Sequence, residues 1–373
     1  MKKIAILIVC AAAIVAGYIF LAPPGSTSKT GTVAQKETIS KDWLPAKLSA
    51  NKAFANQMKG ADPAPAINVL LDNLWAASLE NNQPRVQQAL KNLTDYLAAH
   101  PEAMSTVLDV FKSETDEKKL SLLMPILTDY ENPEGRKLIT EAALELAQHD
   151  ALPAKRQMGL SLMTKATPVD EACLQAIAQI SKNDANNLVR ITAIDIMNVW
   201  LTENPGWGDK LIGGLSAAIE SSNDDTVRGR ALQVLAQQNA QLPEAILKSV
   251  AQCLTTTNAD NRIAAVMVLG EAADDAKSYA LNQLESAFRQ EASLPVKRDI
   301  LVQLVRVGKA QATEILQRLP NNSDTAQDII DFLKIIQDGK TTSLDEIYQQ
   351  KFSLEGERER VAATTPGKPA EKR

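Results

Sequence analysis

The sequence predicts an all-α fold, a row of stacked helical hairpins preceded by one membrane-spanning helix. Three observations support this prediction. Aromatic residues make up only 4% of the 373 residues, whereas Ala, Leu and Gln are frequent, which favours helix over sheet. Basic residues recur at intervals of 34 to 38 residues through the middle of the chain. An uncharged apolar segment lies close to the N-terminus.

The N-terminal segment has the length of a membrane-spanning helix. Ile4–Ala22 carries no charge and would span roughly 28 Å as a helix, close to the ~30 Å bilayer core. Two lysines precede it and the next charge is Lys29, which predicts a cytoplasmic N-terminus and an exported body. We therefore expect a single-pass anchor at 1–22 in a bacterial inner membrane, with the body in the periplasm. A cleaved signal peptide and lipidation of Cys10 are the alternatives.

The remaining chain divides into three parts by composition. Residues 23–62 are rich in Ser, Thr, Gly and Lys and predict a flexible stalk. Residues 63–354 carry the helical pattern and predict the folded body. Residues 355–373 alternate in charge before a Pro-Gly-Lys-Pro stretch, which predicts a disordered charged tail.

The recurring basic residues mark one helix in each repeat. Four positions after each of them the residue is apolar, and seven positions after it is apolar in all repeats but the first. Offsets of four and seven lie on one face of a helix. Three positions before the marker, six of the seven residues are Asn, Asp or Pro, which favour helix starts. The seven markers are Arg85, Lys119, Arg156, Arg190, Arg228, Arg262 and Arg298.

A second amphipathic helix precedes each marked helix. Apolar stripes at helical spacing occupy 138–146, 211–219, 246–254 and 279–288, and Pro243 fits the first position of the third of them. A single hairpin of two such helices cannot cover its own apolar faces. About seven consecutive hairpins are therefore expected to stack into one continuous core.

The middle of the chain resembles HEAT repeats, including their shorter bacterial form. The resemblance rests on Asp225-Thr226-Val227-Arg228, on Asp184 with Arg190 and on Asp260 with Arg262, and it covers about residues 67–340. It implies a right-handed α-solenoid. Tetratricopeptide repeats have a similar period, but their Trp, Gly, Tyr and Pro positions do not recur here.

Two helices are expected at the C-terminal end of the stack. The first covers Asp328–Gln337 and is ended by Gly339. The second is opened by a capping box of Ser343 and Glu346 and would cover the open end of the stack.

The repeated arginines have two interpretations. A row of guanidinium groups could bind an anionic partner, or each arginine could pair with a carboxylate or a loop carbonyl of its own or the next repeat. We favour the second, a structural ladder, with Asp184, Asp225 and Asp260 as the nearest acids. The ladder residues are Arg156, Arg190, Arg228, Arg262 and Arg298.

The chain offers no residue set that predicts catalysis, a cofactor or a metal site. It has only two histidines, and His149 with Glu141 and Glu145 would make a poor zinc site. Cys173 and Cys253 lie two repeats apart, too far for a disulfide, and are expected to be buried thiols. We expect no small-molecule substrate and no enzymatic activity. The net charge of −5 disfavours nucleic-acid binding.

The predicted fold suggests where a partner would bind. Stacked hairpins offer a long concave surface lined by the second helices, which suits a protein or an extended peptide. Five positions after the markers stand the candidate surface residues Asp195, Gln233, Met267 and Gln303. Trp207, in a loop of Gly and Pro, is either a partner anchor or a lid on the helix that follows.

The predicted function is a membrane-anchored scaffold or adaptor in a bacterial cell-envelope assembly. Two alternatives stay open. One is an accessory enzyme of the envelope, because HEAT-like repeats also occur in bilin lyases. The other is an exported soluble adaptor, released by cleavage of the N-terminal segment.

Overall fold

The computed structural model describes residues 63–166, 168–238, 240–320 and 325–339. These residues are mostly α-helical, and among them the β-structure is limited to one isolated parallel bridge between Leu242 and Ala272. Within these ranges no helix is long and apolar enough to cross a membrane. The predicted anchor, stalk, last helix from Ser343 and charged tail lie outside the described residues.

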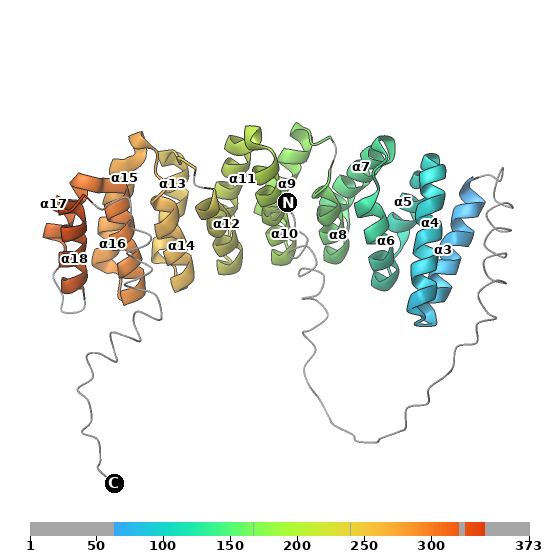
Figure 1. Cartoon of the computed structure of the whole chain (residues 1–373), viewed down its shortest axis with the longest axis horizontal. Coiled ribbons are helices and arrows are strands. Elements are labelled where there is room, and N and C mark those ends of the chain that lie inside the picture. The colour runs from blue at the N-terminus through green and yellow to red at the C-terminus, as the bar shows by residue number, and fades with distance from the viewer. Residues whose placement is uncertain (1–62, 167, 239, 321–324, 340–373) are drawn as a thin grey trace, which may run out of the picture. The chain divides into compact units, whose positions relative to one another are not determined.

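The described helices form consecutive hairpins, each with a first and a second helix (Figure 1). The first helices are α3 (Pro63–Leu79), α5 (Met104–Ser113), α7 (Pro133–His149), α9 (Glu171–Asn183), α11 (Gly208–Ser221), α13 (Glu244–Ala251), α15 (Lys277–Gln290) and α17 (Ala312–Arg318). The second helices are α4 (Gln83–Ala99), α6 (Glu117–Asp129), α8 (Pro153–Met163), α10 (Asn187–Glu203), α12 (Asp225–Gln237), α14 (Ala259–Leu269), α16 (Leu294–Gly308) and α18 (Ala326–Gln337). Short 3₁₀ helices lie in the connections: η2 (Pro101–Ala103), η3 (Pro205–Trp207), η4 (Gln252–Thr255), η5 (Asp274–Ala276) and η6 (Lys309–Gln311).

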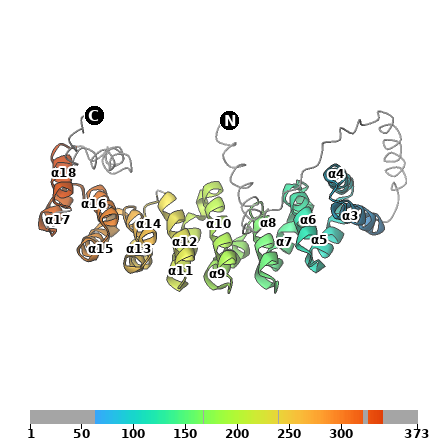
Figure 2. The same ribbon diagram turned by 90° about the horizontal axis from the view of Figure 1, so that it is seen from below.

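Successive hairpins stack in two layers. The first helix α9 packs against α7 and α11, and the second helix α10 packs against α8 and α12. Figure 2 shows α9, α11, α13 and α15 on one side and α10, α12, α14 and α16 on the other. The described part contains eight hairpins rather than about seven, because α17 and α18 form a further pair without a marker arginine. The fold is therefore an α-helical solenoid.

Polar caps start most of the second helices. Asn82 and Asp116 cap α4 and α6 three residues before the marker, as predicted. In α10 and α12 the cap lies one residue earlier than predicted, at Asn186 and Asp224. Asn258 caps α14, where the position three before the marker is Ala259, the one exception to the pattern. Each of these side chains accepts hydrogen bonds from backbone N–H groups of the first turn, which have no partner inside the helix.

Prolines mark two further helix starts. Pro153 is the first residue of α8, as predicted. Pro243 precedes α13 as its cap residue, one position before the predicted one. At the other end of the stack, Gly339 follows α18 with a φ of +68°, a conformation that favours glycine and ends the helix as predicted.

The core lies between the two layers and runs through every hairpin. The apolar positions four and seven after the markers are buried in all the hairpins from α8 to α16, as predicted. Trp200 of α10 is the largest side chain among the fully buried ones. Burial of each such side chain contributes about 1.5–3 kcal/mol. Because neighbouring hairpins share these contacts, each hairpin depends on the next for its stability.

Candidate functional site

Four of the marker arginines bind backbone carbonyls at the C-terminal ends of the first helices, namely Arg156, Arg190, Arg228 and Arg262. Arg156 Nη1 donates to the carbonyl of Asp150 at 2.9 Å, and Arg262 Nη1 donates to that of Thr256 at 2.8 Å. Arg228 donates from Nε instead, to the carbonyl of Ser222 at 2.8 Å. These carbonyls have no helical partner and carry the negative end of the helix dipole, so a cation there is stabilising.

Three of the arginines also bind a carboxylate of the next hairpin. Arg156 makes two hydrogen bonds of 2.7 and 2.8 Å to Asp184, which raise the pKa of the guanidinium. Arg262 does the same to Glu291 at 2.7 and 3.1 Å. In the third pair, Arg298 Nε donates to Asp328 at 3.0 Å. These pairs connect hairpins that are adjacent in the stack.

The carboxylates differ in part from those expected. The structure places Asp184 against Arg156, in the preceding hairpin. Asp225 lies 3.9 Å from Arg228 within the same hairpin. Arg262 pairs with Glu291 rather than with Asp260, which precedes it by only two residues on the same helix.

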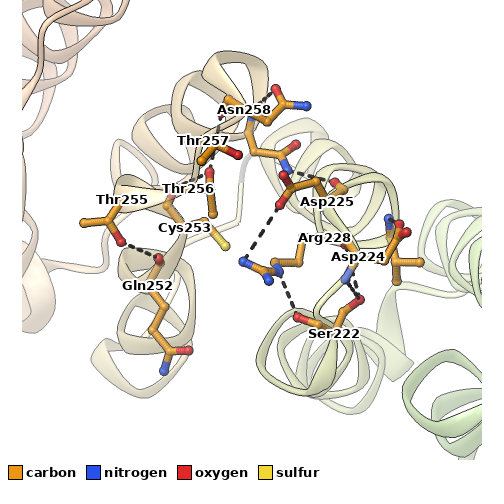
Figure 3. Close-up of polar contacts among 12 residues, drawn as sticks. Ser222, Asp224, Asp225, Arg228, Gln252, Cys253, Thr255, Thr256, Thr257 and Asn258 are labelled. Carbon is orange, nitrogen blue, oxygen red and sulfur yellow. Dashed lines mark hydrogen bonds and ion pairs between the residues drawn. The ribbon is translucent and has the colours of Figure 1, made fainter.

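Arg190 and Arg228, the two central marker arginines, lack such a carboxylate. Asp184 and Glu291 directly follow the first helix of the next hairpin, and this is the corresponding position. Ser222 and Thr256 stand there instead, at the ends of α11 and η4. Arg190 is buried and donates from Nε to the carbonyl of Ser181 at 3.0 Å, and burial lowers its pKa. Figure 3 shows the Arg228 side chain bound to the Ser222 carbonyl and the Asp225 carboxylate, with its guanidinium pointing toward Cys253.

Replacing Thr256 with glutamate is expected to stabilise the protein. Thr256 follows η4 as Glu291 follows α15, so the new carboxylate would reach Arg228 as Glu291 reaches Arg262. Because the Arg228 side chain is 21% exposed, we expect a gain of about 0.5–1 kcal/mol in urea denaturation. Thr256→Gln is the control without charge, and an equal gain in both variants would contradict the ion pair.

The second-helix layer carries the predicted surface residues of the middle hairpins. Asp195 of α10 forms a 2.5 Å ion pair with Arg230 of α12, and both side chains are about one-third exposed. Gln233 is exposed on α12, and Met267 on α14 is 44% exposed. Gln303 is different, because its side chain is only 5% exposed and lies against α14 at Gly270. It is therefore not part of the exposed surface of α16.

Trp207 packs against another tryptophan. It lies in η3, is half-buried, and meets the ring of Trp200 edge-on at a centroid distance of 6.2 Å. Such an edge-to-face pair is a favourable aromatic geometry. The predicted lid was on Leu211 of the helix that follows, whereas this ring contact is with Trp200 of the preceding helix α10.

Two cross-helix contacts were not predicted from the sequence. Arg230 of α12 reaches Asp195 of α10, and Gln238, the residue that follows α12, reaches Asn198 of α10. These partners are 35 and 40 residues apart, so no local pattern links them. The repeat period was the one available signal, since it places residues about 36 apart on neighbouring second helices.

The cysteines and His149 are not brought together. Cys173 and Cys253 are free and buried, and burial raises the pKa of both thiols. His149 is exposed at the end of α7, and nearby Glu145 is paired with Lys112. No group of three or more His, Cys, Asp or Glu side chains that could hold a metal occurs in the described ranges.

No protein-family model matches the chain, and no curated protein matches its sequence. Among solved structures, an engineered protein aligns with 62% of this chain and 97% of its own at 15% identity and a TM-score of 0.35. Human deoxyhypusine hydroxylase aligns with 74% of this chain and 96% of its own, at 17% identity and a TM-score of 0.28. Kap121p bound to Ste12p aligns with 86% of this chain and 47% of its own, at 14% identity and a TM-score of 0.34. At these values the likeness says nothing about what the chain binds.

Proposed function

We propose that this protein is a non-enzymatic scaffold that binds another protein on the exposed face of its second helices. The α-helical solenoid is compatible with such a role. The observation that supports the site best is the polar contact across α10 and α12, where Asp195 and Arg230 meet at the surface beside Gln233. Ion pairs and amides of this kind fix the register of a partner more than they add affinity.

The finer assignments are proposals that rest on the sequence. The repeats would be HEAT-like and the solenoid right-handed, as the motifs around Arg190, Arg228 and Arg262 imply. The apolar segment 4–22 would anchor the chain in a bacterial inner membrane, with the body in the periplasm, where it would serve a cell-envelope assembly. Such a tether raises the effective concentration of the scaffold near membrane-bound partners.

Site-specific photo-crosslinking in the native cell tests the binding face. We expect one discrete adduct from exposed second-helix positions and none from exposed first-helix positions, because the partner would contact a single layer. The second-helix positions are Leu188, Gln233 and Met267, and the first-helix positions are Glu141, Lys210 and Lys248. Adducts from the first-helix positions alone, or none from either layer, would contradict the proposed face.

Membrane extraction tests the anchor separately. The full chain is expected to stay in the membrane pellet after alkaline carbonate treatment and to retain residues 1–22 when its mass is measured. A soluble product lacking the N-terminal segment would show instead that the segment is a cleaved signal peptide.

A further inference from the structure

Five polar side chains form a strip across α10 and α12, and we call it the bridging strip. Its members are Asp195, Asn198, Arg230, Gln233 and Gln238. Arg230 Nε donates to Asp195 at 2.5 Å, and Gln238 Nε2 donates to Asn198 at 3.2 Å. Gln238 Nε2 also lies 3.2 Å from the carbonyl of Val234 on its own helix. These bonds hold long side chains in place before any partner arrives, which lowers the entropy cost of binding them.

The bridging strip keeps donors and acceptors available. Within the described part of the chain, Arg230 Nη2, Asn198 Nδ2 and Gln233 Nε2 have no acceptor, and Asp195 Oδ2 and Gln238 Oε1 have no donor. The side chains of the central ion pair are about one-third exposed, so these atoms can be reached from outside. A ligand group that carries one donor and one acceptor would satisfy both sides of the strip.

The charges of the strip select against a charged ligand group. A carboxylate placed on Arg230 would also lie close to Asp195, and an ammonium placed on Asp195 would lie close to Arg230, because the two groups are in contact. A neutral dipolar group avoids both repulsions, since its N–H can face the carboxylate and its C=O the guanidinium. The peptide group of a protein main chain has this character.

Building on the scaffold role proposed above, we infer that the bridging strip binds the main chain of an extended partner segment. The segment crosses α10 and α12, donates a peptide N–H to Asp195 and accepts a hydrogen bond from Arg230. The amides of Asn198, Gln233 and Gln238 bind the neighbouring peptide groups. Its residues at this contact are uncharged, because the strip disfavours either sign of charge.

The next second helix adds a preference for an apolar side chain. Met267 of α14 is 44% exposed, and methionine adapts its shape to different apolar ligands. Packed helices are about 8–10 Å apart, and an extended chain rises about 3.3 Å per residue, so it needs roughly three residues to pass from one helix to the next. Asp195 lies on α10 and Met267 on α14, two such steps away. We therefore place an apolar residue of the segment about five or six residues from the peptide group at Asp195.

Selection from a displayed library of random linear dodecapeptides tests this inference on the purified full-length protein. The enriched peptides are expected to share an uncharged centre with an apolar residue about five or six positions away. Methylating the peptide nitrogen at the centre should weaken binding about tenfold or more, because it removes a hydrogen bond to a charged acceptor. Asp195→Asn and Arg230→Lys should each weaken the same peptides to a similar degree.

The control uses an ion pair of the same kind in the other layer. Glu171 of α9 pairs with Lys210 of α11, and both side chains are about half exposed. The Glu171→Ala/Lys210→Ala variant should bind the peptides as the wild type does, and melting curves should show all variants folded. No enriched peptides, or peptides whose binding ignores Asp195→Asn and Arg230→Lys, would overturn the inference. Crosslinks from the second helices without peptide binding would overturn it too, while leaving the scaffold role intact.

Discussion

Replacing Gly159 with alanine is expected to destabilise the protein by about 2 kcal/mol. Gly159 lies in α8 where this helix packs directly on α7, and an added Cβ would meet the carbonyl oxygen of Ala143 at 2.6 Å and the nitrogen of Ala147 at 2.9 Å. Both are backbone atoms of a helix, so they cannot rotate away and the hairpin must open. Overpacking of this kind costs about 3 kcal/mol, and the better helix propensity of alanine returns about 1.

The matched control is Gly213→Ala in the interior of α11. Apart from the adjoining residues and the backbone of its own helix, no atom lies within 4 Å of the Cβ that alanine would add there. The same chemical change should therefore stabilise the protein by up to about 1 kcal/mol. Urea denaturation followed by circular dichroism measures both variants. A loss of equal size at both positions would mean that the close approach of α7 and α8 is not the cause.

The repeat and the core could be predicted because both are periodic. The apolar residues four and seven after each marker, such as Leu232 and Leu235, follow the 3.6-residue period of a helix that buries one face. The number of hairpins was predicted from the marker residues, so the hairpin of α17 and α18, which has no marker, was not included. Helix starts were misplaced by one residue where Asn or Asp occurs twice in succession, as at Asn186 and Asn187.

The partners of the candidate site could not be predicted, because they are set by packing between repeats. Glu291 reaches Arg262 from 29 residues away, whereas Asp260 is closer in the sequence but lies on the same helix as the arginine. The repeat period placed Gln303 in the same column as Gln233. The structure buries Gln303 against Gly270, a contact that depends on the glycine that follows α14.

Replacing Glu291 with alanine is expected to cost about 3 kcal/mol of stability. Glu291 accepts two hydrogen bonds from Arg262 and two more from the backbone N–H groups of Ala292 and Ser293. The side chains of the pair are only 15% and 7% exposed, so removing the carboxylate leaves a largely desolvated guanidinium between two hairpins. Glu141→Ala, at an exposed carboxylate 3.9 Å from Lys137, should change stability by less than about 0.5 kcal/mol.

The same carboxylate makes stability depend on pH in the acid range. Burial alone would raise the pKa of Glu291, but the hydrogen bonds from Arg262 and Ser293 outweigh it and hold this pKa below its ordinary value. The unfolded chain, whose glutamate titrates at about 4.3, then binds the proton more tightly than the folded chain does. The contribution is therefore complete above that pH and is lost as the pH falls through the folded pKa. Glu291→Gln removes it, so the stability of this variant should fall less steeply than that of the wild type between about pH 5 and pH 3. If the stabilities of the wild type and of Glu291→Gln, measured by urea denaturation, fell equally steeply over this pH range, Glu291 would titrate alike in the folded and unfolded chains. The Arg262 pair would then not hold the two hairpins together.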